Sequence, residues 1–158
     1  MRITPHENLH VTVTFLGLVD QKLINPISDA VEQAVRDVST FTLEGSGLLC
    51  MVYKDPGMVW YAFAGSPGFS GLTEAVSGRL QTLGVPDSEG RRRTHNRHEP
   101  FAHITLIRCR HIPKPVVERI QNIRFPALTF SVTECGLYNS VVGRGAPVYE
   151  KIREFTLR

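Results

Sequence analysis

The sequence predicts a single α+β domain spanning residues 1–158, and three observations support this fold class. Stretches with the two-residue period of a strand alternate along the chain with stretches that have the 3.6-residue period of a helix. A strand-like His-x-Thr motif occurs twice, at His10 and at His103, which indicates a weak internal repeat of strand and helix. No linker or low-complexity segment separates these elements, and a chain of this length buries about 70% of its unfolded surface on folding.

The hydrophobic periodicities place each element along the chain. The first strand is expected to carry the motif at residues 8–17, and the later strands to cover residues 41–45, 48–52, 58–64, 101–108, 128–137 and 148–157. The expected helices cover residues 25–38, 72–83 and 113–123. This order is strand, helix, strands, helix, strand, helix, strands.

Capping residues and apolar stripes support the three helices. Asn25 and Pro26 are typical of a helix cap and first helical position, and Gly84 is typical of a helix end. In the third helix, the residues expected to face inward are Val116, Val117 and Ile120. On the strand at residues 58–64, we expect Trp60 and Tyr61 to be packing residues rather than ligand-binding residues.

Composition restricts the class of protein. An apolar fraction of 42% and a charged fraction of 21% are ordinary for a soluble globular protein. The net charge of +3 is mild, but 14 of the 18 basic residues are arginine, whose fork of donors suits phosphate, so an anionic ligand is favoured.

Cysteine usage and hydropathy indicate a protein with reduced thiols and without a membrane-spanning segment. Cys50, Cys109 and Cys135 are odd in number and have no Cys-x-x-Cys spacing, which argues against a disulfide framework and a zinc ribbon. We expect reduced thiols in a cytoplasmic protein. The N-terminus lacks the pattern of an export signal and no stretch approaches 18 apolar residues, so neither export nor a membrane partner is indicated.

Residues 85–99 are polar and form an expected surface loop ahead of the second motif. Their basic side chains are Arg91, Arg92, Arg93, His95, Arg97 and His98. Such a run can be a solvated face, or it can contact the backbone of a nucleic acid, and the sequence leaves both readings open.

In an extended strand, each motif presents one imidazole and one hydroxyl on the same face. Alternation places His10 with Thr12 and His103 with Thr105. The opposite, inward face is then apolar, with Leu9, Val11 and Val13 in the first copy and Ala102, Ile104 and Leu106 in the second. Two such strands could bring two histidines together.

The doubling of the motif is the informative feature. Six histidines and 12 threonines in 158 residues predict about 0.5 His-x-Thr triplets by composition. Requiring an apolar residue after both His and Thr reduces this expectation to below about 0.1, and the chain has two. A lone strand histidine is usually structural, whereas a matched pair indicates a site.

Two histidines and two threonines suit a phosphoryl displacement. One imidazole can remove a proton from the attacking oxygen while the other protonates the departing oxygen, since histidine titrates near neutrality. Each threonine hydroxyl can donate a hydrogen bond to a non-bridging phosphoryl oxygen. The motif strands lack the carboxylates of a dinuclear metal site, and no Gly-x-Ser-x-Gly motif is present, so neither metal nor serine chemistry is expected.

These motifs resemble those of the two-histidine phosphoesterase superfamily, in particular its LigT branch of RNA 2',3'-cyclic phosphodiesterases, first described as 2'-5' RNA ligases. The resemblance rests on Asn8-Leu9-His10-Val11-Thr12-Val13-Thr14-Phe15-Leu16-Gly17, His103-x-Thr105, Leu137-Tyr138-Asn139-Ser140 and Ala146-Pro147-Val148-Tyr149-Glu150. It implies a two-lobed fold of mostly antiparallel sheets flanked by helices, with both motifs in a central cleft. It also implies metal-independent hydrolysis of RNA or nucleotide 2',3'-cyclic phosphates to 2'-phosphates, without a cofactor.

The resemblance implies a role for six residues. His103 is the expected general base and His10 the expected general acid on the leaving oxygen. Thr12 and Thr105 match the phosphate-holding threonines. Phe15 matches an aromatic placed against the nucleobase, and Arg108 matches the arginine that reaches the terminal phosphate.

The alternation of side chains along a strand leaves open whether two of these residues face the site. Phe15 lies five positions after His10, and Arg108 five after His103, so strict alternation sends both to the face opposite their histidine. Either the strands twist or bulge before these positions, or both residues belong to the core and the strand edge.

The chain departs from the family pattern in two places. Family members usually open with a strand and a helix ahead of the first motif, and this chain begins about where that helix ends. An internal start site, a shortened chain or an edge covered by a partner chain would explain this, the last through an edge-mediated dimer. The second departure is Ala102, where proline commonly precedes the second histidine.

Three rival functions remain. The same site could, by reversal, join a 2',3'-cyclic phosphate to a 5'-hydroxyl as a 2'-5' RNA ligase. The chain could also be a non-catalytic RNA- or nucleotide-binding module, or a scaffold domain with structural histidines. Intact His and Thr at both motifs argue against the binding module, and the doubling of the motif argues against the scaffold domain.

Overall fold

A computed structural model describes residues 1–52, 57–85, 101–124, 126–141 and 147–158. Its elements, in chain order, are β1 (Arg2–Ile3), η1 (His6–Asn8), η2 (Gln21–Leu23), α1 (Ile24–Val35), β2 (Phe41–Met51), β3 (Gly57–Phe63), α2 (Pro67–Thr82), β4 (His103–Cys109), α4 (Lys114–Gln121), β5 (Thr129–Val132), β6 (Glu134–Val141) and β7 (Val148–Thr156). The basic residues from Arg91 to His98 lie outside the described residues. No described helix is long and apolar enough to cross a bilayer.

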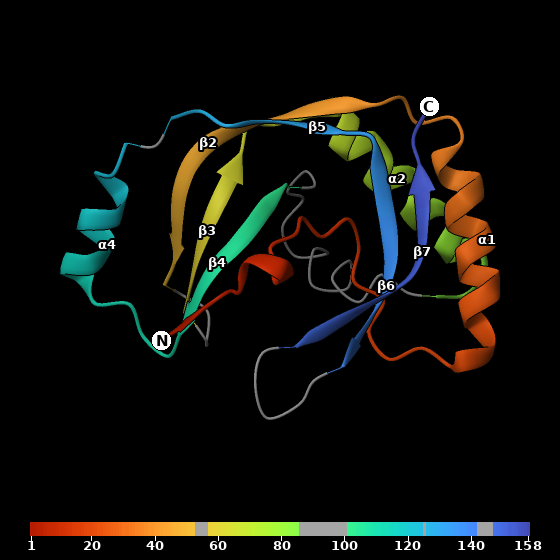
Figure 1. Cartoon of the computed structure of the whole chain (residues 1–158), viewed down its shortest axis with the longest axis horizontal. Coiled ribbons are helices and arrows are strands. Elements are labelled where there is room, and N and C mark those ends of the chain that lie inside the picture. The colour runs from red at the N-terminus through yellow and green to blue at the C-terminus, as the bar shows by residue number, and fades with distance from the viewer. Residues whose placement is uncertain (53–56, 86–100, 125, 142–146) are drawn as a thin grey trace.

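Helices flank two antiparallel sheets, as the predicted α+β class requires. One sheet has the strand order β1-β4-β3-β2-β5, and β6 and β7 pair as a separate two-stranded sheet. In Figure 1, α4 lies beyond β2 at one end of the molecule, and α1 and α2 lie at the other end, beside β7. Strand β5 pairs with β2 and runs on towards β6, so this part of the chain connects the two sheets (Figure 1).

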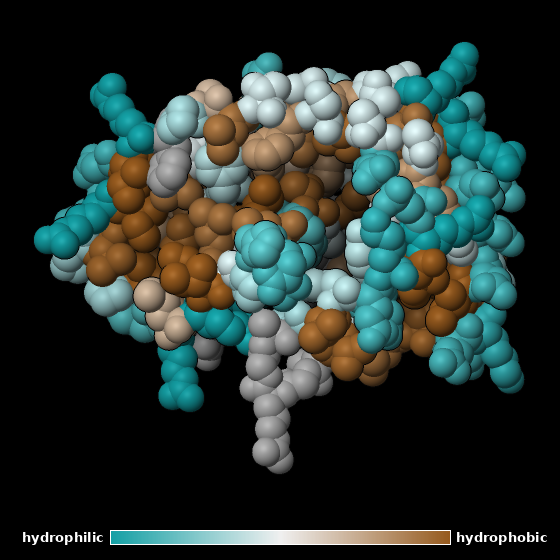
Figure 2. Space-filling view, in the orientation of Figure 1, coloured by the Kyte–Doolittle hydropathy of each residue, from teal (hydrophilic) through white to brown (hydrophobic). Residues whose placement is uncertain are grey.

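Two apolar clusters stabilise the two parts of the molecule. The first lies where α1, α2 and β7 meet, and its buried members are Ile27, Val31, Ala34, Val35, Leu72, Val76, Leu80, Val85 and Phe155. The second lies against the five-stranded sheet, and its buried members are Leu43, Tyr61, Phe63, Phe69 and Ala102. Much of the apolar surface on the face drawn in Figure 2 lies over the side of the five-stranded sheet.

The first helix begins earlier than its expected cap. Asp20, not Asn25, is the capping residue, because its carboxylate accepts a hydrogen bond from the backbone N–H of Lys22 at 2.9 Å and starts the 3-10 turn η2. Helix α1 continues from this turn, so Pro26 lies in the first turn of α1, where its missing N–H has no helical partner to lose. Val38 lies beyond the end of α1 but still packs against the first cluster.

The other two helices follow their expected apolar patterns with two differences: α2 begins at Pro67, five residues before its expected start, and one residue of α4 is oriented differently. Ser66 caps α2 by accepting a hydrogen bond from the N–H of Phe69, and Gly84 follows the helix with a φ of 69°. In α4, Val117 and Ile120 are half-buried, but Val116 is 42% exposed, so its expected inward orientation is wrong. The eight-residue helix α4 contacts chiefly β2 and has no fully buried residue, so its apolar side chains are only partly covered.

Three strand predictions need correction. Residues 41–45 and 48–52 belong to one strand, β2, which absorbs its glycines in a bulge between Gly45 and Gly47, where Gly47 has a φ of 125°. The single strand expected at residues 128–137 is two strands, because β5 pairs with β2 and β6 pairs with β7. The first motif is not a regular strand at all.

The N-terminal segment that carries the first motif pairs with β4 at two separate places and not as one continuous strand. Strand β1 pairs with the far end of β4, the short 3-10 helix η1 interrupts the pairing, and Val11 then forms an isolated β-bridge with Ile104. Val11 and Val13 pack against the second cluster as expected, whereas Leu9 is 42% exposed, because it directly follows η1.

The three cysteines are free thiols. Burial, with a smaller contribution from Glu134, raises the pKa of Cys135 to about 11. Burial, followed by the nearby Cys109, also raises the pKa of Cys50. Both Cys50 and Cys135 are therefore poor nucleophiles near neutral pH.

We expect Gly45→Ala to lower the free energy of unfolding by about 2 kcal/mol. A methyl group there would lie 1.8 Å from the hydroxyl oxygen of the buried Tyr61. This oxygen accepts a hydrogen bond from the N–H of Leu128 at 3.2 Å. The matched control is Gly78→Ala in α2, which meets nothing within 4 Å and should raise stability by about 1 kcal/mol. Urea unfolding measures both, and equal effects would contradict the packing around Tyr61.

We expect Cys135 to react with iodoacetamide at pH 8 at least about 100-fold more slowly in the folded chain than in the unfolded chain. The thiolate is the reactive form, and a pKa near 11 leaves little of it at this pH. The rate should rise about tenfold per pH unit until the pH approaches 11. Mass spectrometry of the labelled peptide follows the reaction, and similar folded and unfolded rates would contradict the burial of this thiol.

Candidate active site

A single antiparallel bridge brings the two His-x-Thr motifs together. Val11, the centre of the first motif, pairs with Ile104, the centre of the second. In an antiparallel pair the flanking residues oppose each other in reverse order, so His10 lies across from Thr105 and Thr12 across from His103. The two histidines are then diagonal neighbours, which in such pairs are about 7–8 Å apart.

The bridge also decides which face carries the polar side chains. Val11 and Ile104 both pack against the second apolar cluster, beside the buried Tyr61 and Phe63. Because side chains alternate across an extended chain, the histidines and threonines on either side of this bridge point to the opposite face. That face is turned away from the apolar core.

Each histidine ring is held by the backbone two residues before it. The Nδ1 of His10 lies 2.7 Å from the carbonyl oxygen of Asn8, and the Nδ1 of His103 lies 3.1 Å from that of Phe101. A carbonyl can only accept, so each Nδ1 carries the proton and donates it. The Nε2 of each ring is therefore the atom that can take up or release a proton.

Each histidine also has an aromatic neighbour. Trp60 stacks on His103 with ring centroids 3.8 Å apart and an angle of 24° between the planes. Tyr149 meets His10 edge-on, with centroids 4.8 Å apart. Trp60 is 9% exposed, so the expectation that it packs is confirmed, but sequence reasoning missed that one of its contacts is a motif histidine.

The first motif lies between the two sheets. On one side it is bridged to β4, and on the other the side-chain amide of Asn8 donates a hydrogen bond to the carbonyl of Pro147 at 2.9 Å. Pro147 directly precedes β7, which also supplies Tyr149. Figure 1 shows this N-terminal segment running between β4 and the β6–β7 hairpin.

His10 and Thr105 line a common pocket with Arg108. The other described residues that line it are Arg2, Thr4, Pro5, Asn8, Pro147 and Tyr149. Arg108 reaches this pocket because β4 has a bulge: Val59 pairs with Ile107 but Trp60 pairs with Thr105, which leaves Leu106 as an extra residue. The bulge restores Arg108 to the face of Thr105 and answers the question of strand parity for this residue.

Not all of the expected site residues reach this pocket. Among its described lining residues, Thr12, His103 and Phe15 are absent. Thr12 is exposed and His103 half-buried on the same face, across the bridge from each other. Phe15 is 52% exposed and lies beyond the bridged part of the motif.

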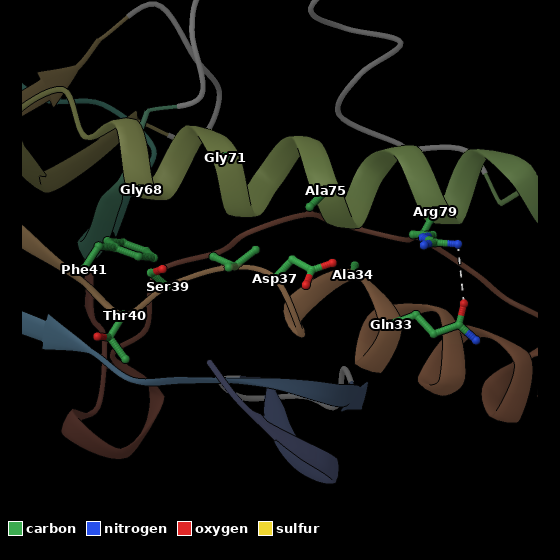
Figure 3. A pocket seen from close by; sticks show the side chains of 11 residues that line it. Gln33, Ala34, Asp37, Ser39, Thr40, Phe41, Gly68, Gly71, Ala75 and Arg79 are labelled. Atoms are coloured by element: carbon green, nitrogen blue, oxygen red, sulfur yellow. Dashed lines mark hydrogen bonds between the residues drawn. The ribbon is translucent and has the colours of Figure 1, made fainter. Parts of the chain in front are cut away.

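A larger cavity, of about 530 Å³, lies between α1, α2 and the start of β2 (Figure 3). Its polar side chains include Asp37 and the pair Arg79–Gln33, in which the guanidinium donates to the amide oxygen at 3.4 Å. Its lining among the described residues contains no histidine or cysteine, so it offers no group that titrates near neutral pH. The motif face is the stronger candidate for an active site.

Candidate metal ligands do not gather in the described parts of the chain. Within them, no three His, Cys, Asp or Glu side chains are placed to hold a metal ion. The expectation of a metal-independent site stays a prediction.

The comparisons with known proteins agree with the predicted fold class. No protein-family model matches the chain. An RNA 2',3'-cyclic phosphodiesterase of Thermotoga maritima is 26% identical over 149 residues, which cover 94% of this chain and 75% of that protein.

Two solved structures have a closely similar architecture. TT0787 of Thermus thermophilus superposes with a TM-score of 0.75 at 22% identity, covering 99% of this chain and 82% of that one. E. coli LigT complexed with 3'-AMP superposes with a TM-score of 0.72 at 22% identity, covering 99% and 80%. The chain thus has a LigT-like fold.

Proposed function

We propose that this chain hydrolyses the 2',3'-cyclic phosphate of RNA or of a nucleotide to a 2'-phosphate, with its two motif histidines as acid and base. The observation that carries the proposal is the bridge between Val11 and Ile104, which brings both His-x-Thr motifs to one face. The similarity to the phosphodiesterase of Thermotoga maritima along most of the chain supports the same reaction.

In the proposed reaction a water molecule attacks the phosphorus atom. The Nε2 of His103 takes a proton from this water, the bond between phosphorus and the 3' oxygen breaks, and the Nε2 of His10 gives its proton to that oxygen. The products are a 2'-phosphate and a 3'-hydroxyl. The hydrogen bonds to Asn8 and Phe101 keep each Nδ1 protonated, so proton transfer is confined to Nε2.

The threonines and Arg108 complete the proposed site. Hydroxyl donors on Thr12 and Thr105 flank the two histidines and can hold the non-bridging phosphoryl oxygens, where negative charge grows in the transition state. Arg108 shares the pocket of His10 and Thr105 and can bind a phosphate there. The half-exposed ring of Phe15 can stack on a nucleobase.

No step of this mechanism passes through a metal ion. General acid–base catalysis contributes typically 10²–10⁴-fold, and hydrogen-bond donors aimed at the phosphoryl oxygens contribute further. The described side chains of the motif face supply both kinds of group. We therefore expect turnover in the presence of a chelator.

We expect His10→Ala and His103→Ala each to lower kcat for adenosine 2',3'-cyclic phosphate by at least about 100-fold, with EDTA present. Neither change should alter thermal unfolding by more than a few degrees, because His10 is exposed and His103 half-buried. His111→Ala, which removes an exposed histidine outside the motifs, is the matched control. Chromatography that separates 2'- from 3'-phosphates measures both rate and product.

Three outcomes would contradict this proposal or change it. A 3'-phosphate product would overturn the assigned leaving oxygen, and activity lost in EDTA and restored by a metal would overturn the mechanism. Binding of the same nucleotide without turnover would favour the non-catalytic nucleotide-binding module.

We expect Trp60→Leu to lower kcat about tenfold and to change KM little. Trp60 acts as a positioning residue, because its ring stacks on His103 and limits rotation of the imidazole. Trp60→Phe keeps an aromatic surface and should restore most of the activity. The kcat of the unmodified chain should follow a bell-shaped pH profile that belongs to the histidine pair, and Trp60→Leu should alter one limb of it. A change in KM alone would contradict the positioning role.

A further inference from the structure

We propose that Arg2 and Arg108 together form a second phosphate subsite, and that the chain accordingly prefers substrates with a phosphate on the 5' oxygen of the terminal nucleotide. This inference rests on the proposed function, because it extends the same pocket. It adds Arg2 to the site, assigns Arg108 to this neighbouring phosphate rather than to the reacting one, and narrows the substrate class.

The two arginines lie directly opposite each other in the sheet. Strand β1 pairs with β4 so that Arg2 opposes Arg108, and the next pair along is Ile3 with Ile107. Directly opposed side chains project to the same face of a sheet. The two guanidinium groups therefore extend from neighbouring strands on the same side, where one anion can be reached by both.

Both arginines belong to the pocket that holds His10 and Thr105. The remaining described residues around it are neutral, so in the part of the chain that the structure describes this pocket has no acidic side chain in its lining. A pocket lined by two arginines and a histidine suits a phosphate group, which carries negative charge. Arginine presents a planar fork of donors that matches the oxygens of this group.

Neighbouring contacts hold the two arginines near the pocket. An Nη of Arg108 lies 3.4 Å from the Sδ of Met58, a weak acceptor that can orient the group without neutralising its charge. Arg2 is attached to β4 through the strand pairing, and the N–H of Thr4 donates to the carbonyl of Leu106 at 2.8 Å just beyond it. The backbone positions of both arginines are thereby set by the sheet.

The spacing along the sheet suits a neighbouring phosphate. On β3, the residue opposite Thr105 is Trp60 and the residue opposite Arg108 is Met58, two positions apart. Two residues of a strand span about 7 Å. A cyclic phosphate beside His10 and Thr105 would thus lie about one ribose from the arginine pair, which is where a phosphate on the 5' oxygen of the same nucleotide is found.

Two kinds of molecule carry a phosphate at this position. In a mononucleotide it is a terminal 5'-phosphate, and in an RNA strand it is the phosphodiester that joins the last two nucleotides. The comparison therefore needs three substrates: adenosine 2',3'-cyclic phosphate, its 5'-phosphorylated form, and an adenylyl dinucleotide that ends in a 2',3'-cyclic phosphate.

We expect kcat/KM to be about tenfold higher for each phosphate-bearing substrate than for adenosine 2',3'-cyclic phosphate, which corresponds to one charge-assisted contact. Arg2→Gln should reduce this ratio to near one, chiefly through KM, and Arg2→Lys should retain part of it. Arg36→Gln, which removes an exposed arginine outside the pocket, should leave the ratio unchanged. A gain for the dinucleotide alone would support the subsite and identify the phosphodiester of RNA as its ligand, whereas equal kcat/KM values for all three substrates would overturn it.

A binding measurement separates failure of the subsite from failure of the proposed function. Calorimetry with adenosine 3',5'-bisphosphate and with adenosine 3'-monophosphate should show about tenfold tighter binding of the bisphosphate, lost in Arg2→Gln. If the chain turns over no substrate but binds the bisphosphate more tightly than the monophosphate, the proposed function is wrong and the subsite is supported. Equal affinities, or a difference that survives Arg2→Gln, would overturn the subsite.

Discussion

The antiparallel bridge between Val11 and Ile104 is the contact on which the rest of the motif face depends. It joins a chain segment without regular structure to the ordered strand β4 and sets two His-x-Thr triplets in reverse register. The pairing of β1 with the far end of β4 supports it, because the N-terminal segment is then attached to the same strand on both sides of η1. A shift of one residue would turn every motif side chain to the other face.

Contacts of two different kinds hold each imidazole. A backbone carbonyl defines which nitrogen carries the proton, and an aromatic ring restricts rotation. The surroundings differ, since His103 lies within the sheet over the buried Trp60, whereas His10 is exposed and meets Tyr149 from the hairpin. The position of His10 therefore depends on how the β6–β7 hairpin packs against the rest of the chain.

The first motif also connects the two apolar clusters. Val13 packs partly against both of them, and so does Phe41 at the start of β2. Packing on both sides fixes the segment that carries His10, although a single isolated β-bridge orders it within the described parts of the chain. The pocket at its edge gathers Arg2 and Arg108 from paired strands with Tyr149 from the hairpin, so its lining comes from both sheets while its arginines come from the five-stranded sheet.

The sequence by itself determined the fold class, the positions of most helices and strands, and the pairing of His10 and Thr12 with His103 and Thr105 as a repeated motif. These follow from local periodicity, which depends on residues that are close along the chain. Only the tertiary structure decided the bulge at Leu106 that brings Arg108 into the pocket, the stacking of Trp60 on His103 and the opposition of Arg2 to Arg108. Strand register and bulges are set by contacts between distant segments, and no local pattern in one sequence encodes them.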